Sequence, residues 1–130
     1  MENPKRPGIR IDDIMIDCGD EQKLGAFYAG LLVWEAAPIG EGCVAVSAPG
    51  GALRILCQGE ADYAPPVWPE TPGTQQKMMH LDFTVDDLAA AVRLALSLGA
   101  TMAQTQYRPD QWRTLLDPAG HPFCLCLPEA

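Results

Sequence analysis

Residues 13–20 (Asp-Ile-Met-Ile-Asp-Cys-Gly-Asp) and residues 80–87 (His-Leu-Asp-Phe-Thr-Val-Asp-Asp) follow one pattern in the two halves of this chain. Each stretch alternates apolar and polar residues, which is typical of a strand with one buried face. Each ends on an aspartate that suits the N-cap of a following helix. Each half then closes with a glycine-containing turn and another apolar strand. The chain is therefore predicted to contain two copies of one β-α-β-β-β unit.

The periodicity of each half predicts where its elements lie. In the first half we expect strands over residues 11–18, 33–37, 43–47 and 53–58 and a helix over 21–32. In the second half we expect strands over residues 79–85, 101–106, 112–116 and 123–127 and a helix over 88–98. These elements predict one α+β domain over residues 1–130, with a first module at about 10–58 and a second at about 77–127.

Residues 59–76 contain four prolines and two glycines, which excludes regular structure over most of the segment. We therefore interpret the segment as a linker between the modules. It is long for a compact domain, so we expect it to pack or to serve function. Tyr63 and Trp68 are its candidate anchors, and contact with a ligand is the alternative role for both.

The amino-acid composition limits the kinds of molecule that the protein is expected to bind. Seventeen acidic residues against nine basic residues give a net charge of −8. Nucleic acid and anionic membranes both require a basic surface, so we expect neither as a partner. Five cysteines, an odd number without a C-x-x-C pair, favour unpaired thiols in a reducing compartment. The N-terminus lacks the apolar core of a signal peptide, and the expected location is the cytoplasm.

Several motifs give the chain a resemblance to a known superfamily. They are Phe27-Tyr28 in the first expected helix, His80-Leu81-Asp82-Phe83 in the second half, and the turn Asp117-Pro118-Ala119-Gly120. Over about residues 10–127 the chain resembles the vicinal oxygen chelate superfamily, which includes glyoxalase I, bleomycin-resistance proteins and extradiol dioxygenases. It is most similar to the small glyoxalase-like domain proteins. The resemblance implies two βαβββ modules that pair into an open, cup-like barrel, and it implies a homodimer.

Metal-dependent members of this superfamily take two metal ligands from each module. The corresponding positions here are Asp13, Arg54, His80 and Cys124, and a two-residue shift in register would replace Arg54 by Leu56. An arginine guanidinium cannot coordinate a cation, because it stays protonated and has no free lone pair. A thiolate is a soft ligand that suits zinc and not the harder ions. We therefore expect no metal cofactor, with a divalent ion on Asp13, His80 and Cys124 as the alternative.

The same strand faces predict a pocket for a small organic ligand. Its candidate residues are Asp13, Met15, Asp17, Arg54, Gln58, His80, Asp82, Trp112 and Cys124. For Met15 and Trp112 the alternative is core packing. Arg54 would pair with Asp13 or Asp17, or bind an anionic group of the ligand by its two-pronged fork.

His80 is the candidate acid or base of this pocket, since its charge changes near neutral pH. The alternative is a structural histidine that bonds to Asp13 or Asp82. Cys124 would need a neighbouring base to become a nucleophile, and we favour a structural role for it. His121 follows a turn and is also expected to be structural.

The predicted function is metal-free binding of a small organic molecule between the modules, as in bleomycin-resistance relatives. The acidic character of the chain suits a basic or cationic molecule. One alternative is a metal-dependent lyase or isomerase of the glyoxalase type that uses Asp13 and His80. Another is an interaction module whose cup is filled by side chains or by the linker. An extradiol dioxygenase is excluded because the chain has only two histidines, one of them in a turn. Glyoxalase I is not expected, because its His/Glu/His/Glu-type ligand set is absent.

Overall fold

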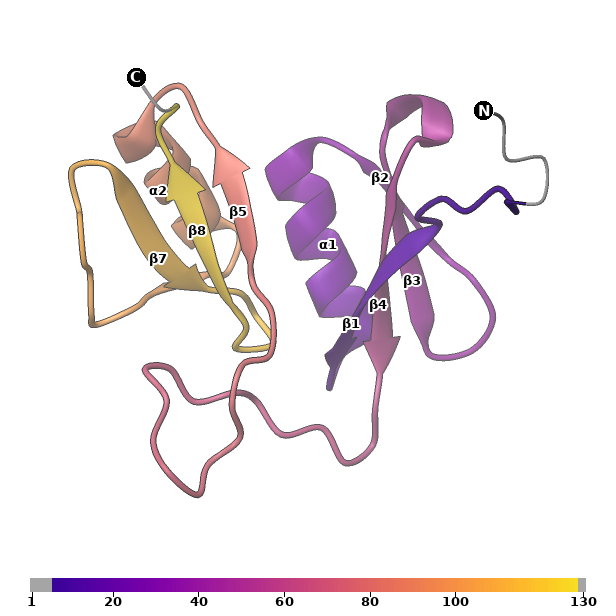
Figure 1. Ribbon diagram of the computed structural model, residues 1–130, viewed down its shortest axis with the longest axis horizontal. Coiled ribbons are helices and arrows are strands. Elements are labelled where there is room, and N and C mark those ends of the chain that lie inside the picture. Colours follow the sequence, from indigo (N-terminus) through magenta and orange to yellow (C-terminus); the bar gives the residue numbers. More distant parts are fainter. Residues whose placement is uncertain (1–5, 129–130) are drawn as a thin grey trace.

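The computed structural model describes residues 6–128, which form two four-stranded sheets and two main helices (Figure 1). The first module contains β1 (Asp13–Cys18), α1 (Glu21–Leu32), β2 (Glu35–Pro38), β3 (Cys43–Ser47), the short 3₁₀ turn η1 (Pro49–Gly51) and β4 (Arg54–Gly59). The second module contains β5 (Leu81–Thr84), α2 (Leu88–Ser97), β6 (Thr101–Met102), β7 (Trp112–Leu116) and β8 (Pro122–Cys126).

The two sheets share one topology. The strand orders are β1-β4-β3-β2 and β5-β8-β7-β6. In each sheet the first strand runs parallel to the last, and the remaining pairs are antiparallel. The predicted α+β class and the repeated βαβββ unit are therefore confirmed. The sheets remain open and do not close into a barrel.

Both helices begin at the aspartates that close the repeated stretches. The Asp20 carboxylate accepts a hydrogen bond from the Lys23 amide, and the Asp87 carboxylate accepts one from the Ala90 amide, each at 3.0 Å. These bonds satisfy amides that the first turn of a helix otherwise leaves without a partner. Gly99 follows α2 with a φ of +117°, which a residue with a side chain rarely adopts.

Helix α1 lies between the two sheets and joins the modules (Figure 1). Its buried stripe includes Leu24, Phe27 and Tyr28, each about 1% exposed. The Phe27 ring packs against that of Phe123 in the second sheet at a centroid distance of 5.7 Å. Full burial of a large apolar side chain contributes about 1.5–3 kcal/mol, so this stripe stabilises the contact between the modules.

One expected strand is shorter than its pattern indicated. Residues 101–106 were expected to form a strand, but β6 covers only Thr101–Met102. The side chain of Gln106 accounts for the difference. Its amide donates to the Thr114 carbonyl at 2.8 Å and accepts from the Thr114 amide at 2.9 Å. The side-chain amide of Gln106 thus provides the hydrogen-bond partners for the backbone groups of Thr114 in β7 that a neighbouring strand would otherwise provide.

No helix among residues 6–128 is long and apolar enough to cross a membrane.

Candidate functional site

A cavity of about 670 Å³ opens where β1, the linker and the start of β5 meet. It lies between the two modules. Its walls are formed by residues 14–17 of β1, Tyr28 of α1, residues 60–64 and Pro66 of the linker, residues 75–81, and His121 with Pro122. The cavity is therefore a product of the tertiary fold, since no one module supplies all its walls.

Two side chains from distant parts of the chain, Tyr63 and His121, hold the linker over this cavity. The Tyr63 hydroxyl donates to the Ala119 carbonyl at 2.5 Å and lies 3.1 Å from His121 Nε2. His121 Nε2 also lies 2.7 Å from the backbone oxygen of Asp17. The predicted anchoring role of Tyr63 and the structural role of His121 agree with these contacts. Trp68, the other candidate anchor, packs edge-on against Tyr107 and does not line the cavity.

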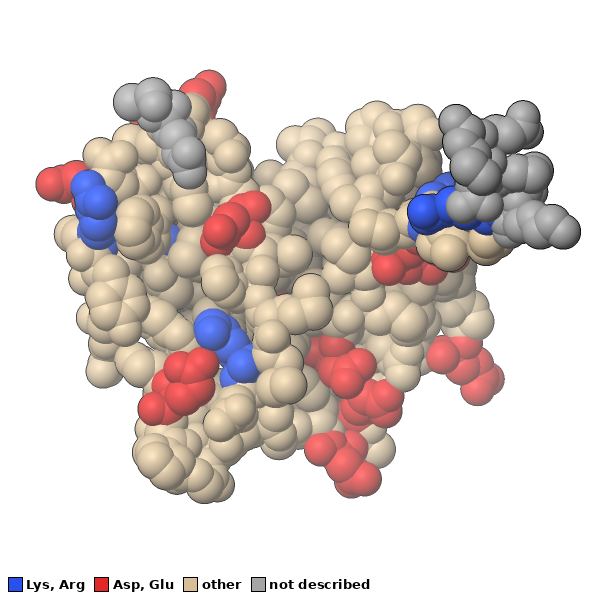
Figure 2. Space-filling model, in the orientation of Figure 1, with Lys and Arg blue, Asp and Glu red and all other residues tan. Residues whose placement is uncertain are grey.

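The cavity walls combine apolar and acidic side chains. Exposed methionines at positions 15, 78 and 79 supply much of the apolar surface. Asp17, Glu60 and Asp62 supply carboxylates, and Figure 2 shows acidic groups gathered on the lower part of this face. Lys77 also lines the cavity, but its ammonium group lies 3.2 Å from a carboxylate oxygen of Glu70. The net electrostatic character of the walls is therefore negative.

The predicted ligand residues divide among three places. Met15, Asp17 and His80 line the cavity. Asp13, Arg54 and Gln58 lie on the first sheet, and Asp82, Trp112 and Cys124 belong to the second. Gln58 donates to the Glu60 carboxylate at 2.6 Å. The Arg108 guanidinium carbon lies 5.7 Å from the centre of the Trp112 ring. The structure thus brings three of the nine residues into the cavity.

Asp13 and Arg54 form an ion pair with two hydrogen bonds. Arg54 Nε donates to Asp13 Oδ1 at 2.7 Å, and Arg54 Nη2 donates to Oδ2 at 3.1 Å. The two residues are direct partners in the parallel ladder of β1 and β4. Both carboxylate oxygens of Asp13 therefore face a fixed cation.

The metal of the superfamily does not fit the four positions considered from the sequence. In the second sheet the ladder partner of Cys124 is Asp82, two residues beyond His80. In the first sheet, Asp13 occupies the position of His80, and the residue two positions further along, Met15, pairs with Leu56. The residue of the first module that corresponds to Cys124 is therefore Leu56 and not Arg54. Neither residue is a metal ligand, and Asp13 is engaged by the guanidinium. The first module thus offers no free donor at either register.

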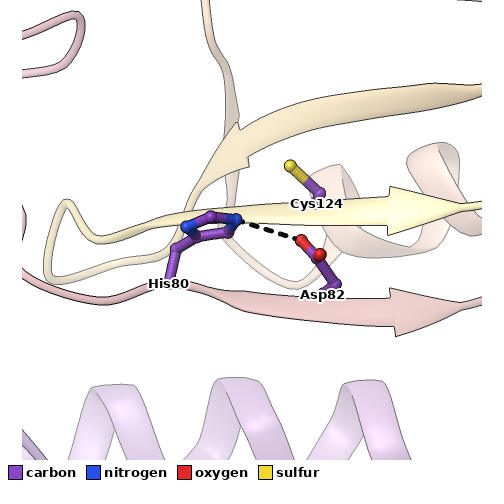
Figure 3. Close-up of side chains that lie close together, drawn as sticks. All are labelled: His80, Asp82 and Cys124. Atoms are coloured by element: carbon purple, nitrogen blue, oxygen red, sulfur yellow. Dashed lines mark ion pairs between the residues drawn. The ribbon is translucent and has the colours of Figure 1, made fainter.

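A second cluster lies on β5 and β8 (Figure 3). His80 Nε2 lies 3.2 Å from Asp82 Oδ1, and the Cys124 thiol completes a group whose donor atoms all lie within 4.8 Å of one another. Burial and the Asp82 carboxylate raise the pKa of the Cys124 thiol above its usual value. A nucleophilic cysteine needs a lowered pKa, so this environment favours a non-nucleophilic role for Cys124.

The sequence patterns did not identify several residues of the cavity. Glu60, Asp62, Lys77 and Met78 line it, but they belong to the linker or its flanks and follow no strand or helix period. The one signal that pointed to them was the length of the linker, because long irregular loops in compact domains are commonly functional.

Comparison with known proteins agrees with this architecture. The sequence profile of the glyoxalase-like domain family matches residues 13–126, so the chain belongs to that family and to the vicinal oxygen chelate superfamily. A search of the curated proteins finds no match.

Three solved structures illustrate the likeness of the fold. A glyoxalase/dioxygenase from Nostoc punctiforme has a TM-score of 0.65 at 19% identity, over 99% of both chains. A glyoxalase/bleomycin resistance protein/dioxygenase family enzyme from Burkholderia phytofirmans PsJN has a TM-score of 0.65 at 19% identity, over 89% of this chain and 96% of its own. TnmS3, an antibiotic binding protein from Streptomyces sp. CB03234, has a TM-score of 0.60 at 16% identity, over 95% and 99%. At these identities the comparison establishes the fold alone.

Proposed function

We propose that this protein binds a small organic molecule in the cavity between its two modules, and that the cavity residues hold the molecule without a metal ion. The observation that carries the proposal is the open volume of about 670 Å³ with mixed apolar and polar walls. Sites for small molecules commonly have volumes of about 300–1,000 Å³ and combine an apolar lining with a few polar groups. The ion pair of Asp13 with Arg54 supports the metal-free part of the proposal.

The chemistry of the walls favours an apolar organic cation. Asp17, Glu60 and Asp62 provide negative charge, and the methionines at positions 15, 78 and 79 provide deformable apolar contact. The net charge of −8 acts in the same direction over longer distances. The antibiotic binding protein among the structural neighbours supports small-molecule binding as a role for this fold.

Two other functions receive less support. A lyase or isomerase that uses Asp13 and His80 around a metal would need these side chains to converge. Among residues 6–128, however, Asp13 is absent from the cluster that contains His80. An interaction module with a filled cup would need side chains or the linker to occupy the space between the modules. Tyr63 lies in the cavity wall, and the space beside it remains open.

We further propose that the protein forms a homodimer in the cytoplasm and binds neither nucleic acid nor membranes. Ile9, Ile11, Met78 and Met79 are between 71% and 86% exposed. Exposed apolar side chains mark contact sites where they form a contiguous patch, and we propose that a second copy of the chain covers these four residues. The five free cysteines and the acidic net charge support the location and the excluded partners.

The test uses ethidium, a fluorescent apolar cation, and protein that has been treated with a chelator. We expect saturable binding with one site per chain. Replacing Asp17 by lysine should weaken binding at least about tenfold, since a repulsive charge would then face the cation. The matched control is Asp110→Lys, which makes the same charge change at an exposed position outside the cavity.

The control variant should bind within about twofold of the unchanged protein, because an exposed charge at a distance is screened by salt. Equal weakening by Asp17→Lys and Asp110→Lys would show that ethidium senses only net charge. That result, or an absence of saturable binding, would contradict the proposed site.

A further inference from the structure

The cluster of His80, Asp82 and Cys124 lies outside the walls described above, apart from the shared residue His80. His80 precedes β5, Asp82 lies within β5, and Cys124 lies on the neighbouring strand β8. Asp82 and Cys124 are direct partners in the parallel ladder, so the backbone register itself places the carboxylate beside the thiol. The sheet therefore sets the placement of Asp82 and Cys124, and His80 joins them from the position directly before β5.

The spacing of two of the donor atoms is close to that of two ligands in a tetrahedral zinc site. His80 Nε2 and Asp82 Oδ1 lie 3.2 Å apart, and all three donor atoms lie within 4.8 Å of one another. Nitrogen and oxygen ligands lie about 2.0–2.2 Å from zinc, so two of them on a tetrahedron are separated by roughly 3.3–3.5 Å. A zinc–sulfur bond of about 2.3 Å places sulfur roughly 3.5 Å from the other ligands, so the thiol, which lies within 4.8 Å of both, must approach them by at most roughly 1.3 Å to complete the set.

The donor types also select for the kind of ion. Imidazole, carboxylate and thiolate together suit zinc, whereas magnesium and calcium prefer oxygen ligands alone. A side chain outside the set orients the thiol, because Thr114 Oγ1 lies 3.4 Å from Cys124 Sγ. The His80 and Asp82 side chains are 40% and 63% exposed, which leaves an ion a path from solvent.

We propose that His80, Asp82 and Cys124 bind one Zn²⁺ ion on the second sheet, with an exogenous donor in the fourth position. The site differs from the ligand set that the superfamily implies, because it uses Asp82 and takes no donor from the first module. Arg54 excludes the three-ligand set of Asp13, His80 and Cys124 by occupying the Asp13 carboxylate. The zinc site shares His80 with the organic-ligand cavity, but its tests measure zinc and cobalt binding in the absence of ethidium, so failure of the zinc proposal is distinguishable from failure of the cavity proposal.

The first experiment measures zinc binding by the full chain without an affinity tag, after chelator treatment, by competition with a chromophoric chelator. We expect one zinc per chain, and we expect Asp82→Asn and Cys124→Ser each to weaken binding at least about tenfold. Two matched controls, Cys43→Ser and Asp13→Asn, change the same residue types outside the cluster and should leave the affinity within about twofold.

A second measurement uses only the unchanged protein, so its result does not depend on whether a variant folds. Cobalt(II) is added to the unchanged protein, and its absorption spectrum is recorded. We expect the intense near-ultraviolet band of a thiolate bound to cobalt, together with the visible bands of a tetrahedral ion. Absence of the thiolate band would overturn the proposal whatever the variants do. Loss of zinc binding in Asp13→Asn would overturn it too, because the ion would then lie at the superfamily's position.

Discussion

The hydrogen bond between Tyr28 and Asp117 joins the two modules inside the core, and its removal has a calculable effect. The Tyr28 hydroxyl donates to Asp117 Oδ2 at 2.6 Å, and the two residues are 1% and 4% exposed. Asp117 Oδ1 accepts from the amides of Ala119 and His121 at 2.9 and 3.0 Å. Tyr28→Phe therefore keeps the ring and the turn but removes the hydroxyl that Oδ2 accepts from.

A hydrogen bond to a charged group contributes about 1.5–3 kcal/mol, and the buried carboxylate oxygen would be left without that donor. The entropy of unfolding is about 2.1 cal/mol/K per residue, or roughly 0.27 kcal/mol/K for this chain. We expect Tyr28→Phe to lower the free energy of unfolding by about 2 kcal/mol and the Tm by about 7 °C.

Urea denaturation and differential scanning calorimetry at neutral pH measure the two quantities. The matched control is Tyr107→Phe, since the Tyr107 side chain is 65% exposed and its ring also packs against another aromatic residue. This control should change stability by less than about 0.5 kcal/mol. If Tyr28→Phe costs no more than Tyr107→Phe, the reasoning that this bond stabilises the contact between modules is refuted.

Three further predictions concern the same region and the edge of the second sheet. Burial raises the pKa of Asp117 in the folded chain above its value in the unfolded chain. The stabilising contribution of the protonated group is therefore present below the unfolded pKa and is lost as pH rises through the folded pKa, so stability should fall above about pH 4. Asp117→Asn should flatten this fall, which urea denaturation measures at a series of pH values. Tyr63→Phe removes the donor to the Ala119 carbonyl, and amide hydrogen exchange of residues 60–64 should become faster, while unchanged exchange would show that this contact does not hold the linker. Gln106→Leu leaves the Thr114 amide without its acceptor, while the Thr114 carbonyl still accepts from the Ala103 amide, and the change should cost about 1–3 kcal/mol in urea denaturation. A cost below about 0.5 kcal/mol would exclude the Gln106 amide as a substitute for a strand backbone.

Local patterns were sufficient to predict most of the fold. Alternation and helical periodicity are set by which face of an element is buried, so they identified both helices and all eight strands. Asp20 was predicted as the cap of α1, and Asp86 or Asp87 as the cap of α2; the structure confirms Asp20 and selects Asp87, because capping depends only on neighbouring amides. The strand over 101–106 was too long since the Gln106 side chain replaces its backbone, and that substitution depends on a distant partner, Thr114.

The residues of the candidate site were harder to predict from the sequence than the helices and strands, for a physical reason. Strand periodicity identifies which residues share a face, but it does not specify which faces of two modules converge. Seven of the nine predicted residues accordingly divide between a cavity, an ion pair and a cluster, while Gln58 and Trp112 belong to none of the three. The Tyr63 hydroxyl bonds to the Ala119 carbonyl, a contact between distant residues that strand periodicity does not predict. The pairing of Arg54 with Asp13 was one of two alternatives open to the sequence, and adjacent positions in the parallel ladder favour it over Asp17.

The most direct test of metal-free ligand binding is a calorimetric titration of ethidium into the protein before and after removal of metals with a chelator. The account predicts one ethidium per chain after chelation, with a Kd no weaker than before chelation, since the cavity walls supply the binding groups. Binding that disappears on chelation and returns with added metal would contradict the account, because a metal ion would then be holding the ligand.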